Sequence, residues 1–334
     1  MSAIADVARA AGVSKSTASR ALSGRGYVSE STRARVVSAA ASMGFVVSTN
    51  ASSLVTGQTR NVGVVIPFIS RWFFSEVLEG IESALIAGGY DLTLYRLSPD
   101  ADERRRVFDY FLVRKRVDAV IAVGIALTPN EVEMLSALGR PIVGIGGVIS
   151  GISTLSIDDE RVMRLATEHV IGLGHSRIVH LGGNQDDQQD FRVPAQRLRA
   201  FRDALARGGI RSADDFRETG FSIQAGYSAA LSLLADPSRP TAIVAACDEI
   251  AIGVIIAARE LGIAIPAQLS VVGIDDHDLS EMFGLTTVRQ DPAGQGAMAV
   301  GQVMRELVGD AIGDVSITLP VSLRVRTSTG PLGR

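Results

Sequence analysis

The residues best suited to chemistry in this chain are hydrogen-bond donors on one face of a short helix near the N-terminus. They are Lys15, Ser16, Thr17 and Arg20. The helix that carries them is predicted over about Lys15–Leu22, and no acidic residue lies between Arg9 and Glu30. Arginine and lysine contact guanine edges in the major groove of DNA, and serine, threonine and lysine bind phosphates. This face therefore suits DNA, although a helical hairpin with a solvated polar face would show the same pattern.

Two further helices are predicted to position this face. Gly12 lies in a turn of about three residues after the first helix, the length found in a helix-turn-helix. Ser14 caps the second helix, and Ser29 caps a third helix that ends at Gly44. The residues expected to pack between the helices are Ile4, Val7 and Ala8 in the first, Ala18, Ala21 and Leu22 in the second, and Val36, Val37, Ala40 and Met43 in the third.

Charge is distributed unevenly along the chain. The 334 residues have a formal net charge of −3. Residues 1–60 contain seven Lys or Arg and two acidic residues, a balance of +5, and the remaining 274 residues contain 26 basic and 34 acidic groups, a balance of −8. A small basic end joined to a larger acidic part indicates that the basic end meets a polyanion.

Composition excludes several other kinds of protein. Cys247 is the only cysteine, so the chain forms no internal disulfide and no cysteine-based metal site. The four histidines show no metal-ligand spacing, and we expect neither a metal nor a cofactor. No apolar run approaches the roughly 18 residues of a membrane span, and charged residues interrupt the N-terminus where a signal peptide needs an apolar core. These features predict a soluble protein of the reducing cytoplasm.

A polar segment separates the basic end from the rest of the chain. Phe45–Arg60 is rich in Ser, Thr, Asn and Gly, as linkers are. Its middle, Asn50–Leu54, is long enough for about one helical turn, which is unstable in isolation. Propensity alone therefore favours a flexible linker.

From Asn61 onward, short apolar runs alternate with helical stretches. The expected strands are 61–67, 91–96, 118–124, 141–147, 177–183, 216–220, 241–247 and 269–275. The expected helices are 75–88, 102–114, 130–138, 160–173, 194–207, 224–234 and 249–261. Apolar strands separated by helices indicate parallel sheets that are covered on both faces. Two successive α/β series of similar size predict two lobes.

Residues that follow strands are the candidates for ligand binding, because ligands of open parallel sheets bind beyond the carboxyl ends of the strands. Four aromatic residues lie within 68–74, and we expect Arg71, Trp72 and Phe73 to contribute to a wall for a sugar ring or a base. Phe74 is assigned to the core beneath the following helix. Asp275 ends a strand, where its carboxylate could bind a ligand hydroxyl.

No enzyme signature stands out. The sequence has no P-loop, no G-x-S-x-G motif and no nucleotide fingerprint that opens a helix after a strand. Two pairs of acids, Asp158-Asp159 and Asp186-Asp187, lie at a predicted helix start and in a loop. Carboxylates at helix starts are routine caps, so these pairs are interpreted as structural.

The segment IADVARAAGVSKSTASRALSGRGYVSESTRARVVSAAASMGF resembles the DNA-binding head of the LacI/GalR family of bacterial transcription regulators. The resemblance continues through LVTGQTRNVGVVIP and covers nearly the whole chain. It implies that Lys15, Ser16 and Arg20 contact bases. The residues that it implies for phosphate contacts are Ser14, Thr17, Ser19, Tyr27, Ser29 and Thr32.

The resemblance also implies a role for the linker. In the family this segment is a hinge helix, ordered on DNA, that inserts an apolar wedge into the minor groove, and Ala51 and Leu54 are the matching residues. Most members carry a Pro-Asn pair before the hinge, and here Val47-Ser48 stands instead. The entry to the hinge is therefore expected to be less rigid than in those members.

For the rest of the chain the resemblance implies a body of the periplasmic-binding-protein type. The expected fold is an all-α helix-turn-helix head followed by a two-lobed α/β body with two parallel-sheet subdomains, between which the chain crosses near residues 157, 289 and 320. The expected domains are the head at 1–45, the hinge at 46–60 and an effector-binding and dimerisation body at 61–334. Within the body, the N-lobe is expected at about 61–157 and 290–319, and the C-lobe at about 158–289 and 320–330.

Several body residues match positions that contact ligands in the family. Arg197 and Phe221 match a ligand-contacting arginine and an aromatic wall, and the resemblance favours Asp275 as a ligand residue over a purely structural ion pair. Cys247 stands where many members have Asn, so a polar contact is lost or altered. Its thiol is expected to be buried and inert, with a lining position as the alternative. Gly146-Gly147 replaces a carboxylate of some sugar-responsive members, which indicates a bulkier or differently recognised effector.

The sequence thus predicts a bacterial DNA-binding transcription regulator, with repression as the expected mode and the nucleoid as its place in the cell. We expect a homodimer, because one head makes too few contacts and two heads on a two-fold axis match a pseudo-palindromic operator. The absence of a trailing leucine heptad favours a dimer over a tetramer. A small molecule in the cleft between the lobes, with sugars as the favoured class, is expected to control operator binding. The alternatives are a solute-binding protein for transport, which needs export, and a sugar-modifying enzyme, which needs an acid–base pair or a nucleophile.

Overall fold

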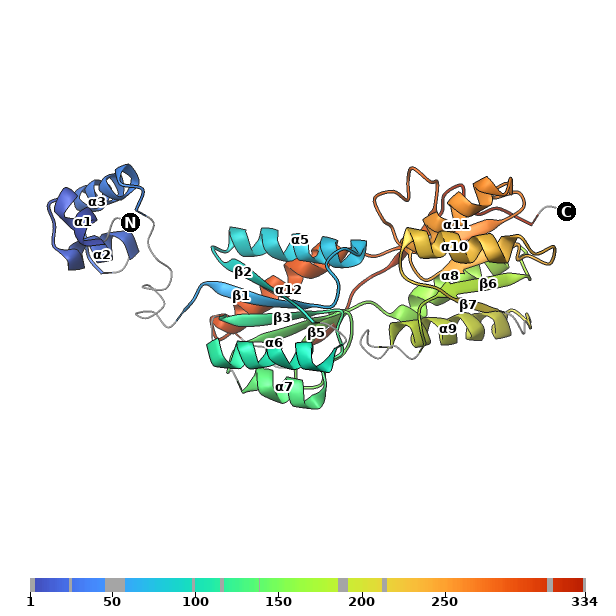
Figure 1. Cartoon of the computed structure of the whole chain (residues 1–334), viewed down its shortest axis with the longest axis horizontal. Helices are drawn as coiled ribbons and strands as arrows, with labels where there is room; N and C mark the ends of the chain where they lie inside the picture. Colours follow the sequence, from blue (N-terminus) through green and yellow to red (C-terminus); the bar gives the residue numbers. More distant parts are fainter. Residues whose placement is uncertain are drawn as a thin grey trace. The chain divides into compact units, whose positions relative to one another are not determined.

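The computed structural model describes residues 4–23, 26–45, 58–97, 100–114, 117–137, 139–185, 192–211, 215–310 and 315–332 (Figure 1). Contacts divide the chain into two units, Met1–Asn61 with Arg116–Asp118, and Val62–Lys115 with Ala119–Arg334. We call the helices of the first unit the head and the second unit the body. The domain boundaries stay predictions, and the expected hinge residues, Ala51 and Leu54, lie outside the described residues.

The head consists of three short helices around a small apolar core. They are α1 (Ile4–Ala10), α2 (Lys15–Ser23) and α3 (Glu30–Ser42). Gly12 has a φ of +64°, which the turn between α1 and α2 requires, and the N–H of Val13 donates to the carbonyl of Ala8 at 2.9 Å. The core residues are Val7, Ala8, Ala11, Ala18, Ala21, Val36 and Ala40. The prediction for Val37 was wrong, since this side chain is 50% exposed.

The first sheet of the body, with the helices that cover it, is called the N-lobe. Its strands are β1 (Asn61–Ile66), β2 (Asp91–Arg96), β3 (Ala119–Val123), β4 (Ile142–Ile145), β5 (Ser153–Ser156) and β11 (Ser316–Thr318), in the order β11-β5-β4-β3-β1-β2. The pairs β1–β3, β3–β4, β4–β5 and β5–β11 are parallel. Strands β1, β3 and β4 are almost wholly buried, which matches their apolar sequences.

The second sheet, with its helices, is called the C-lobe. Its strands are β6 (Ile178–Gly182), β7 (Phe216–Glu218), β8 (Ala242–Ala245), β9 (Ser270–Asp275), β10 (Thr286–Arg289) and β12 (Ser322–Arg324), in the order β12-β10-β9-β8-β6-β7. The pair β10–β12 is antiparallel, and the other pairs are parallel. Because β11 belongs to the first sheet and β12 to the second, the chain passes from one sheet to the other between them.

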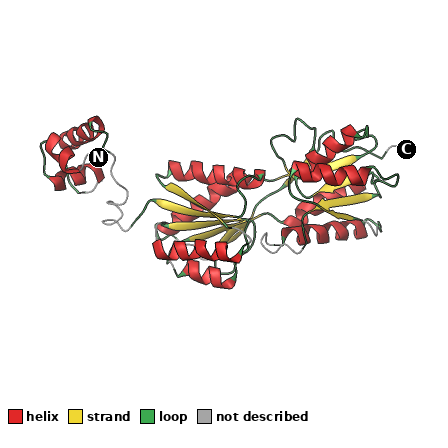
Figure 2. Ribbon diagram, viewed as in Figure 1, coloured by secondary structure: helices red, strands yellow, loops and turns green. Residues whose placement is uncertain are grey.

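Helices cover both faces of each sheet (Figure 2). In the N-lobe they are α5 (Trp72–Ala87), α6 (Ala101–Arg114), α7 (Pro129–Ser136) and α12 (Pro292–Leu307). In the C-lobe they are α8 (Asp159–Gly172), α9 (Val193–Arg207), α10 (Ile223–Leu234) and α11 (Asp248–Glu260). The pairs α5–α12, α10–α11 and α8–α9 pack against each other, and α6 and α7 lie across the first sheet from α5 (Figure 1). Of the described helices, none is long and apolar enough to cross a membrane.

Glycines allow α5 and α12 to pack backbone to backbone. A Cβ atom on Gly80 would lie 2.0 Å from the carbonyl oxygen of Ala293, and one on Gly296 would lie 2.3 Å from the carbonyl oxygen of Val77. Neither position has room for a side chain. The two helices can approach this closely only because both positions are glycine, although glycine lowers the helix propensity of each helix.

The C-lobe repeats this arrangement with α10 and α11. A Cβ atom on Gly226 would lie 2.5 Å from the carbonyl oxygen of Ile250, and one on Gly253 would lie 2.3 Å from that of Ile223. Each lobe thus has one helix pair whose separation is fixed by main-chain contact. Such a pair positions the loops at its ends more firmly than contact through long side chains would.

Some elements of the body were missed by the sequence pattern. They are β5, β10, β11, β12 and α12. Strand β5 is Ser-Thr-Leu-Ser, which has the composition of a loop, and β11 and β12 have three residues each. Helix α12 contains three glycines, which lower its helix propensity. Two of its residues, Ala293 and Gly296, lie against the main chain of α5, and this contact between distant segments is not visible in the local sequence.

The glycine contacts predict opposite effects for two substitutions in α12. Gly296→Ala places a methyl group against main-chain atoms and should lower the free energy of unfolding by about 1–3 kcal/mol. Gly301 has no heavy atom within 4 Å of the corresponding Cβ position. Gly301→Ala should therefore raise the free energy of unfolding, by up to about 1 kcal/mol. Urea denaturation measures both, and stabilisation by both substitutions would contradict the packing argument.

Candidate functional site

The N-terminal turn of α2 presents polar side chains to solvent. The Oγ of Ser14 accepts the N–H of Thr17 at 3.1 Å and thereby caps the helix. The same oxygen lies 2.9 Å from the hydroxyl of Ser16 and 2.8 Å from that of Thr17. Lys15, Ser16, Ser19 and Arg20 are exposed, and Thr17 is half-buried. The donors singled out in the sequence thus lie on the open side of one helix, next to its N-terminus.

The position of Arg20 depends on a glycine in the following loop. Gly26 has a φ of +72°, and a Cβ atom there would lie 3.1 Å from Cδ of Arg20. The aliphatic part of Arg20 therefore packs against Gly26, in space that the side chain of any other residue at position 26 would occupy. On the far side of α2, the guanidinium of Arg33 donates to the carbonyl of Ala21 at 3.1 Å, which ties the end of α2 to α3.

A second group of hydroxyls lies at the start of α3. Tyr27 is 93% exposed. The Oγ of Ser29 accepts the N–H of Thr32 at 3.4 Å and donates to its hydroxyl at 2.9 Å. The head therefore has two helix N-termini that are capped by serine and surrounded by hydroxyls. Both the helix dipole and these donors favour an anion such as a backbone phosphate.

The body contains a pocket with about 690 Å³ of empty space at the carboxyl ends of strands from both sheets. Six residues expected to contact an effector line it, namely Arg71, Phe73, Arg197, Phe221, Cys247 and Asp275. The seventh, Trp72, does not belong to the lining. The pocket is also lined by residues that the sequence pattern does not single out, which include Asp159, Val193, Glu249, Gln290 and Gln295.

A buried ion pair joins α8 and α9 at the pocket. The guanidinium of Arg197 donates to Oδ1 of Asp159, at 2.9 Å from Nε and 2.6 Å from Nη2, and also donates to the carbonyl of Ala246. Burial raises the pKa of Asp159, and the charge of Arg197 opposes this shift. The interpretation of Asp159 as a cap was wrong, since its neighbour Asp158 caps α8 by accepting the N–H of Arg161. The position of Asp159 after the missed strand β5 was the available signal.

Asp275 lies at the end of β9 in a chain of amides. Its Oδ1 accepts a hydrogen bond from Nε2 of Gln290 at 2.6 Å, and Oε1 of Gln290 accepts one from Nε2 of Gln295 at 2.9 Å. Burial raises the pKa of Asp275 to about 7. The φ angles are +123° at Asp275 and +62° at Asp276, which are rare for residues with a side chain. Strain of this kind is common at ligand sites, where it aims a side chain.

Apolar groups complete the wall of the pocket. Cys247 is buried, and burial together with the charge of Asp275 raises the pKa of its thiol well above the usual range. The thiol is therefore buried and also lines the pocket. The ring of Phe221 lies against Gly183, where a Cβ atom would be 2.3 Å from Cε2 of the ring. Phe74 is in the core, as predicted, and its ring also lines the pocket.

Trp72 lies outside this wall and contacts the C-lobe instead. Its ring stacks on the imidazole of His277, with centroids 4.8 Å apart and an interplanar angle of 28°. Its Nε1 donates to Oδ2 of Asp278 at 3.4 Å. The expected role of Trp72 as part of a ligand wall is therefore corrected: it joins α5 to the loop after β9.

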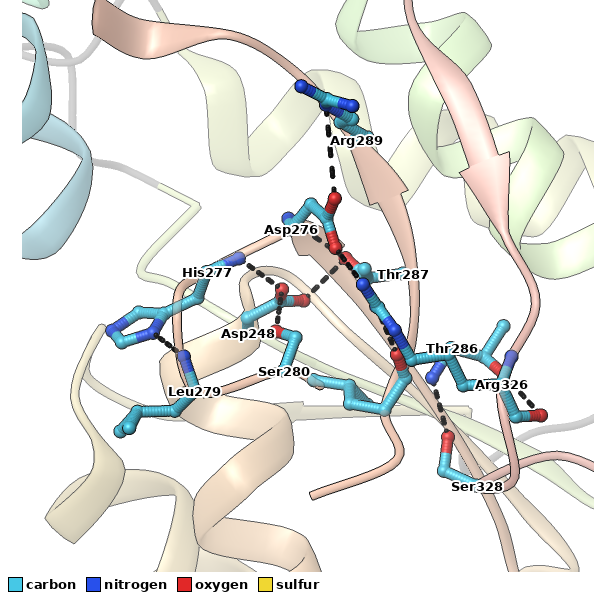
Figure 3. A network of polar contacts seen from close by, with 11 residues as sticks. Asp248, Asp276, His277, Leu279, Ser280, Thr286, Thr287, Arg289, Arg326 and Ser328 are labelled. Atoms are coloured by element: carbon cyan, nitrogen blue, oxygen red, sulfur yellow. Dashed lines mark hydrogen bonds and ion pairs between the residues drawn. The ribbon is translucent and has the colours of Figure 1, made fainter. Parts of the chain in front are cut away.

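Asp248, at the start of α11, holds that loop in place (Figure 3). Its Oδ2 accepts the N–H of His277 at 2.9 Å and the hydroxyl of Ser280 at 2.7 Å, and its Oδ1 accepts the hydroxyl of Thr287 at 2.7 Å. Asp248 is wholly buried, and burial, with a contribution from Asp275, raises its pKa to about 8. One carboxyl group thus connects α11, the loop after β9 and strand β10.

Comparison with known proteins assigns both parts of the chain. Residues 3–48 match the model of the bacterial regulatory proteins of the lacI family, and residues 167–329 match a periplasmic binding protein-like domain. Catabolite control protein A of Priestia megaterium is 30% identical over 331 residues, which cover 98% of each chain. The transcriptional repressor PurR of Vibrio cholerae is 31% identical over 318 residues, which cover 93% of this chain and 92% of that protein.

Solved structures show the same similarity. The lac repressor dimer bound to operator and the anti-inducer ONPF superimposes with a TM-score of 0.86 at 27% identity, over 98% of this chain and 99% of that chain. A LacI family transcriptional regulator from Enterococcus faecium with bound ribose gives a TM-score of 0.72 at 27% identity, over 82% of this chain and 100% of that chain. The helical head and the two-sheet body therefore occur together in solved proteins.

The raised pKa values of Asp248 and Asp275 predict a dependence of stability on pH. The folded chain keeps protons that an unfolded aspartate, with a pKa of about 3.9, has released. These groups therefore stabilise the fold fully below about pH 4, and this contribution is lost as pH rises through about 8 for Asp248 and about 7 for Asp275.

Asp248→Asn should remove one of these contributions and keep the contacts. The carboxamide oxygen of Asn can accept the His277 N–H and the Ser280 hydroxyl, and its NH₂ can donate to Thr287. The difference in unfolding free energy between wild type and variant should decline from about pH 5 to about pH 8, by up to about 1.4 kcal/mol per pH unit. Urea denaturation across this range measures it, with the exposed Asp203→Asn as control. A difference that stays constant with pH would show that Asp248 is ionised throughout.

Proposed function

The chain belongs to the lacI family of bacterial regulatory proteins, and we propose that it represses transcription as a homodimer whose operator affinity is set by a small molecule in the pocket of the body. It is a DNA-binding transcriptional regulator, as its relatives are named repressors and the lac repressor shares its fold. The observation that carries the finer proposal is that one chain combines an exposed donor face on α2 with a pocket lined from both lobes.

In the proposed complex, α2 enters the major groove. Lys15, Ser16 and Arg20 contact base edges, because they are exposed on this helix and can donate hydrogen bonds to guanine or to a bridging water. The residues proposed for phosphates are Ser14, Thr17, Ser19, Tyr27, Ser29 and Thr32. Ala51 and Leu54 are proposed to contact the minor groove in the hinge. Binding then depends strongly on salt through the phosphate contacts, and the protein acts at the nucleoid in the cytoplasm.

A homodimer follows from the size of the head. One head offers few base contacts, and two heads on a two-fold axis can contact two half-sites of a pseudo-palindrome. The lac repressor structure that resembles this chain is a dimer on its operator. The two-fold arrangement also makes the distance between the hinges sensitive to how the lobes pack, which gives a ligand in the pocket a route to the DNA.

The pocket favours a sugar or sugar derivative as the effector. Phe73 and Phe221 line the pocket, and aromatic rings pack against the apolar face of a sugar ring, while the carboxyl of Asp275 can accept from hydroxyls. Arg197 is neutralised by its ion pair with Asp159, so it can donate to a neutral ligand without leaving a charge unpaired. The relatives include the ribose operon repressor of Escherichia coli, which is 29% identical over 98% of this chain.

Binding explains these groups better than catalysis does. The carboxylate of Asp159 is held in an ion pair, and that of Asp275 accepts the amide of Gln290. Each of these carboxyl groups therefore already has a partner in the fold, and the thiol of Cys247 has a raised pKa, which opposes nucleophilic attack. A transport protein with the same two-lobed body would have no use for the helix-turn-helix head.

Arg20→Ala tests the proposed contact with bases. An operator isolated by selection from random duplexes is compared with a scrambled duplex at one salt concentration. The ratio of the two affinities should fall by about 10-fold to 100-fold, because a bidentate contact to guanine discriminates by about 1–3 kcal/mol. Arg9→Ala is the matched control, since Arg9 is an exposed arginine of α1 that pairs with Asp6. It should weaken both affinities alike. Equal behaviour of the two variants would refute the role of Arg20.

Asp275→Asn tests the proposed effector site. A thermal-shift screen of sugars on wild-type protein first identifies a ligand. Its affinity should fall by about 10-fold or more in the variant, since a hydrogen bond to a charged or polarised carboxyl contributes about 1.5–3 kcal/mol. Operator binding without ligand should be retained. Asp203→Asn, on the exposed side of α9, should bind the sugar as wild type does. Unchanged affinity in Asp275→Asn would place the effector elsewhere.

A further inference from the structure

The first residue of α5 connects the N-lobe to the C-lobe outside the ligand pocket. The indole of Trp72 stacks on His277 at 4.8 Å and donates to Asp278 at 3.4 Å. Both partners belong to the loop between β9 and β10, in the other lobe. The backbone N–H of Trp72 also hydrogen-bonds the carboxylate of Glu249, at the start of α11. One residue thus contacts two elements across the cleft.

Arg71, next in the chain, extends the same contact. Its guanidinium carbon lies 3.4 Å from the ring centre of Phe68 in its own lobe and 5.5 Å from that of Phe221 in the C-lobe. Its charge also stabilises the ionised form of Glu249. Cation–π contacts within about 6 Å are attractive. Arg71 and Trp72 together therefore contact three separate C-lobe segments.

One charged pair opposes this contact. Glu76 lies one helical turn after Trp72, and the charge of Asp278 contributes, after burial, to raising its pKa. Trp72 and Glu76 lie on one face of α5, and Asp278 accepts from the Trp72 indole, so the like charges of Glu76 and Asp278 oppose this contact. The hydrogen bond from Trp72 to Asp278 favours contact between the lobes, whereas the like charges of Glu76 and Asp278 disfavour it.

The C-lobe side of the contact is held firmly. The N–H of His277 donates to the buried carboxyl of Asp248 at 2.9 Å, and the imidazole Nδ1 accepts the N–H of Leu279 at 3.0 Å. The second bond fixes the plane of the imidazole ring. Trp72 therefore stacks on a surface that is oriented before the lobes meet, so less entropy is lost when they do.

We propose that Arg71 and Trp72 form a latch with Phe221, Glu249, His277 and Asp278, which holds the lobes together and is opposed by the like charges of Glu76 and Asp278. The latch sets how readily the pocket opens. Trp72 is a positioning residue, which acts on the effector through lobe closure, whereas Arg71 also lines the pocket. The consequence for operator binding rests on the proposed function, but the latch itself is tested without DNA or effector.

The repulsive half is tested with the intrinsic fluorescence of the full-length protein, because Trp72 is its only tryptophan. Acrylamide quenching measures how accessible this ring is. Glu76→Gln should lower the quenching constant about twofold, as expected for an exposed charge pair. The same substitution in an Asp278→Asn background should change nothing, because the repulsion is already absent. Glu82→Gln, an exposed glutamate of the same helix, is the control and should match wild type.

The attractive half is tested by substituting the stacked rings. His277→Ala should raise the quenching constant of Trp72, and His277→Phe should restore it, because a phenyl ring keeps the stacking. Hydrogen exchange of residues 276–284 should be about threefold to tenfold faster in Trp72→Ala than in wild type, and close to wild type in Trp72→Phe. Far-ultraviolet circular dichroism confirms that each variant is folded.

Two results would overturn the latch. One is equal quenching in wild type, Glu76→Gln and His277→Ala. The other is equal exchange of residues 276–284 in folded Trp72→Ala and wild type. Because these measurements involve neither operator nor sugar, a failed latch leaves the proposed function standing. Conversely, a chain that binds no DNA would leave the fluorescence results unaffected.

Discussion

The carboxyl group of Asp248 is the interaction on which the organisation of the C-lobe depends. A carboxyl group that is wholly removed from water has to be protonated or surrounded by donors, and here three donors from the loop after β9 and from β10 surround it. These three hydrogen bonds form together only when that loop takes one conformation. The neighbouring residues in the chain, Cys247 and Glu249, then lie at the pocket, and His277 is presented to the N-lobe.

Main-chain contact between helices gives this arrangement a firm base. The pairs α5–α12 and α10–α11 approach so closely that glycine is required at the crossing points. The start of α5 carries Arg71 and Trp72, and the start of α11 carries Asp248 and Glu249. The groups that face each other across the cleft therefore come from the two helix pairs whose packing allows the least movement.

Much of this could be predicted from the sequence, for two different reasons. The head followed from helical spacing, caps and a glycine turn, and the body followed from alternating apolar strands and helices. Arg197 and Phe221 could be named only through the resemblance to a family, because no periodicity marks a residue that faces a ligand. Val37 was misplaced because three helices in a head this small bury only part of each apolar stripe.

The errors in the site have a common physical origin. Asp159 was taken for a cap because the polar strand before it, β5, did not register as a strand, so its place at a sheet edge was not recognised. Trp72 was assigned to a ligand wall because an aromatic residue after a strand suggests stacking, and the pattern cannot say on what. Both assignments depend on contacts between distant segments, 38 residues apart for Asp159 and Arg197 and 206 residues apart for Trp72 and Asp278. Local sequence carries no information on such contacts.

The overlap between latch and pocket determines what an effector has to do. Arg71, Phe221 and Glu249 belong to both the proposed latch and the pocket lining, so a ligand in the pocket would contact groups that the latch uses. A ligand shifts an equilibrium only by its difference in affinity for the two states. A ligand that contacts both lobes and leaves Arg71 on Phe221 therefore favours the closed form. A ligand that separates Arg71 from Phe221 favours the closed form only if its own contacts are at least as strong as the one it breaks. Arg71 is thus the side chain at which the proposed latch and the lining of the pocket coincide.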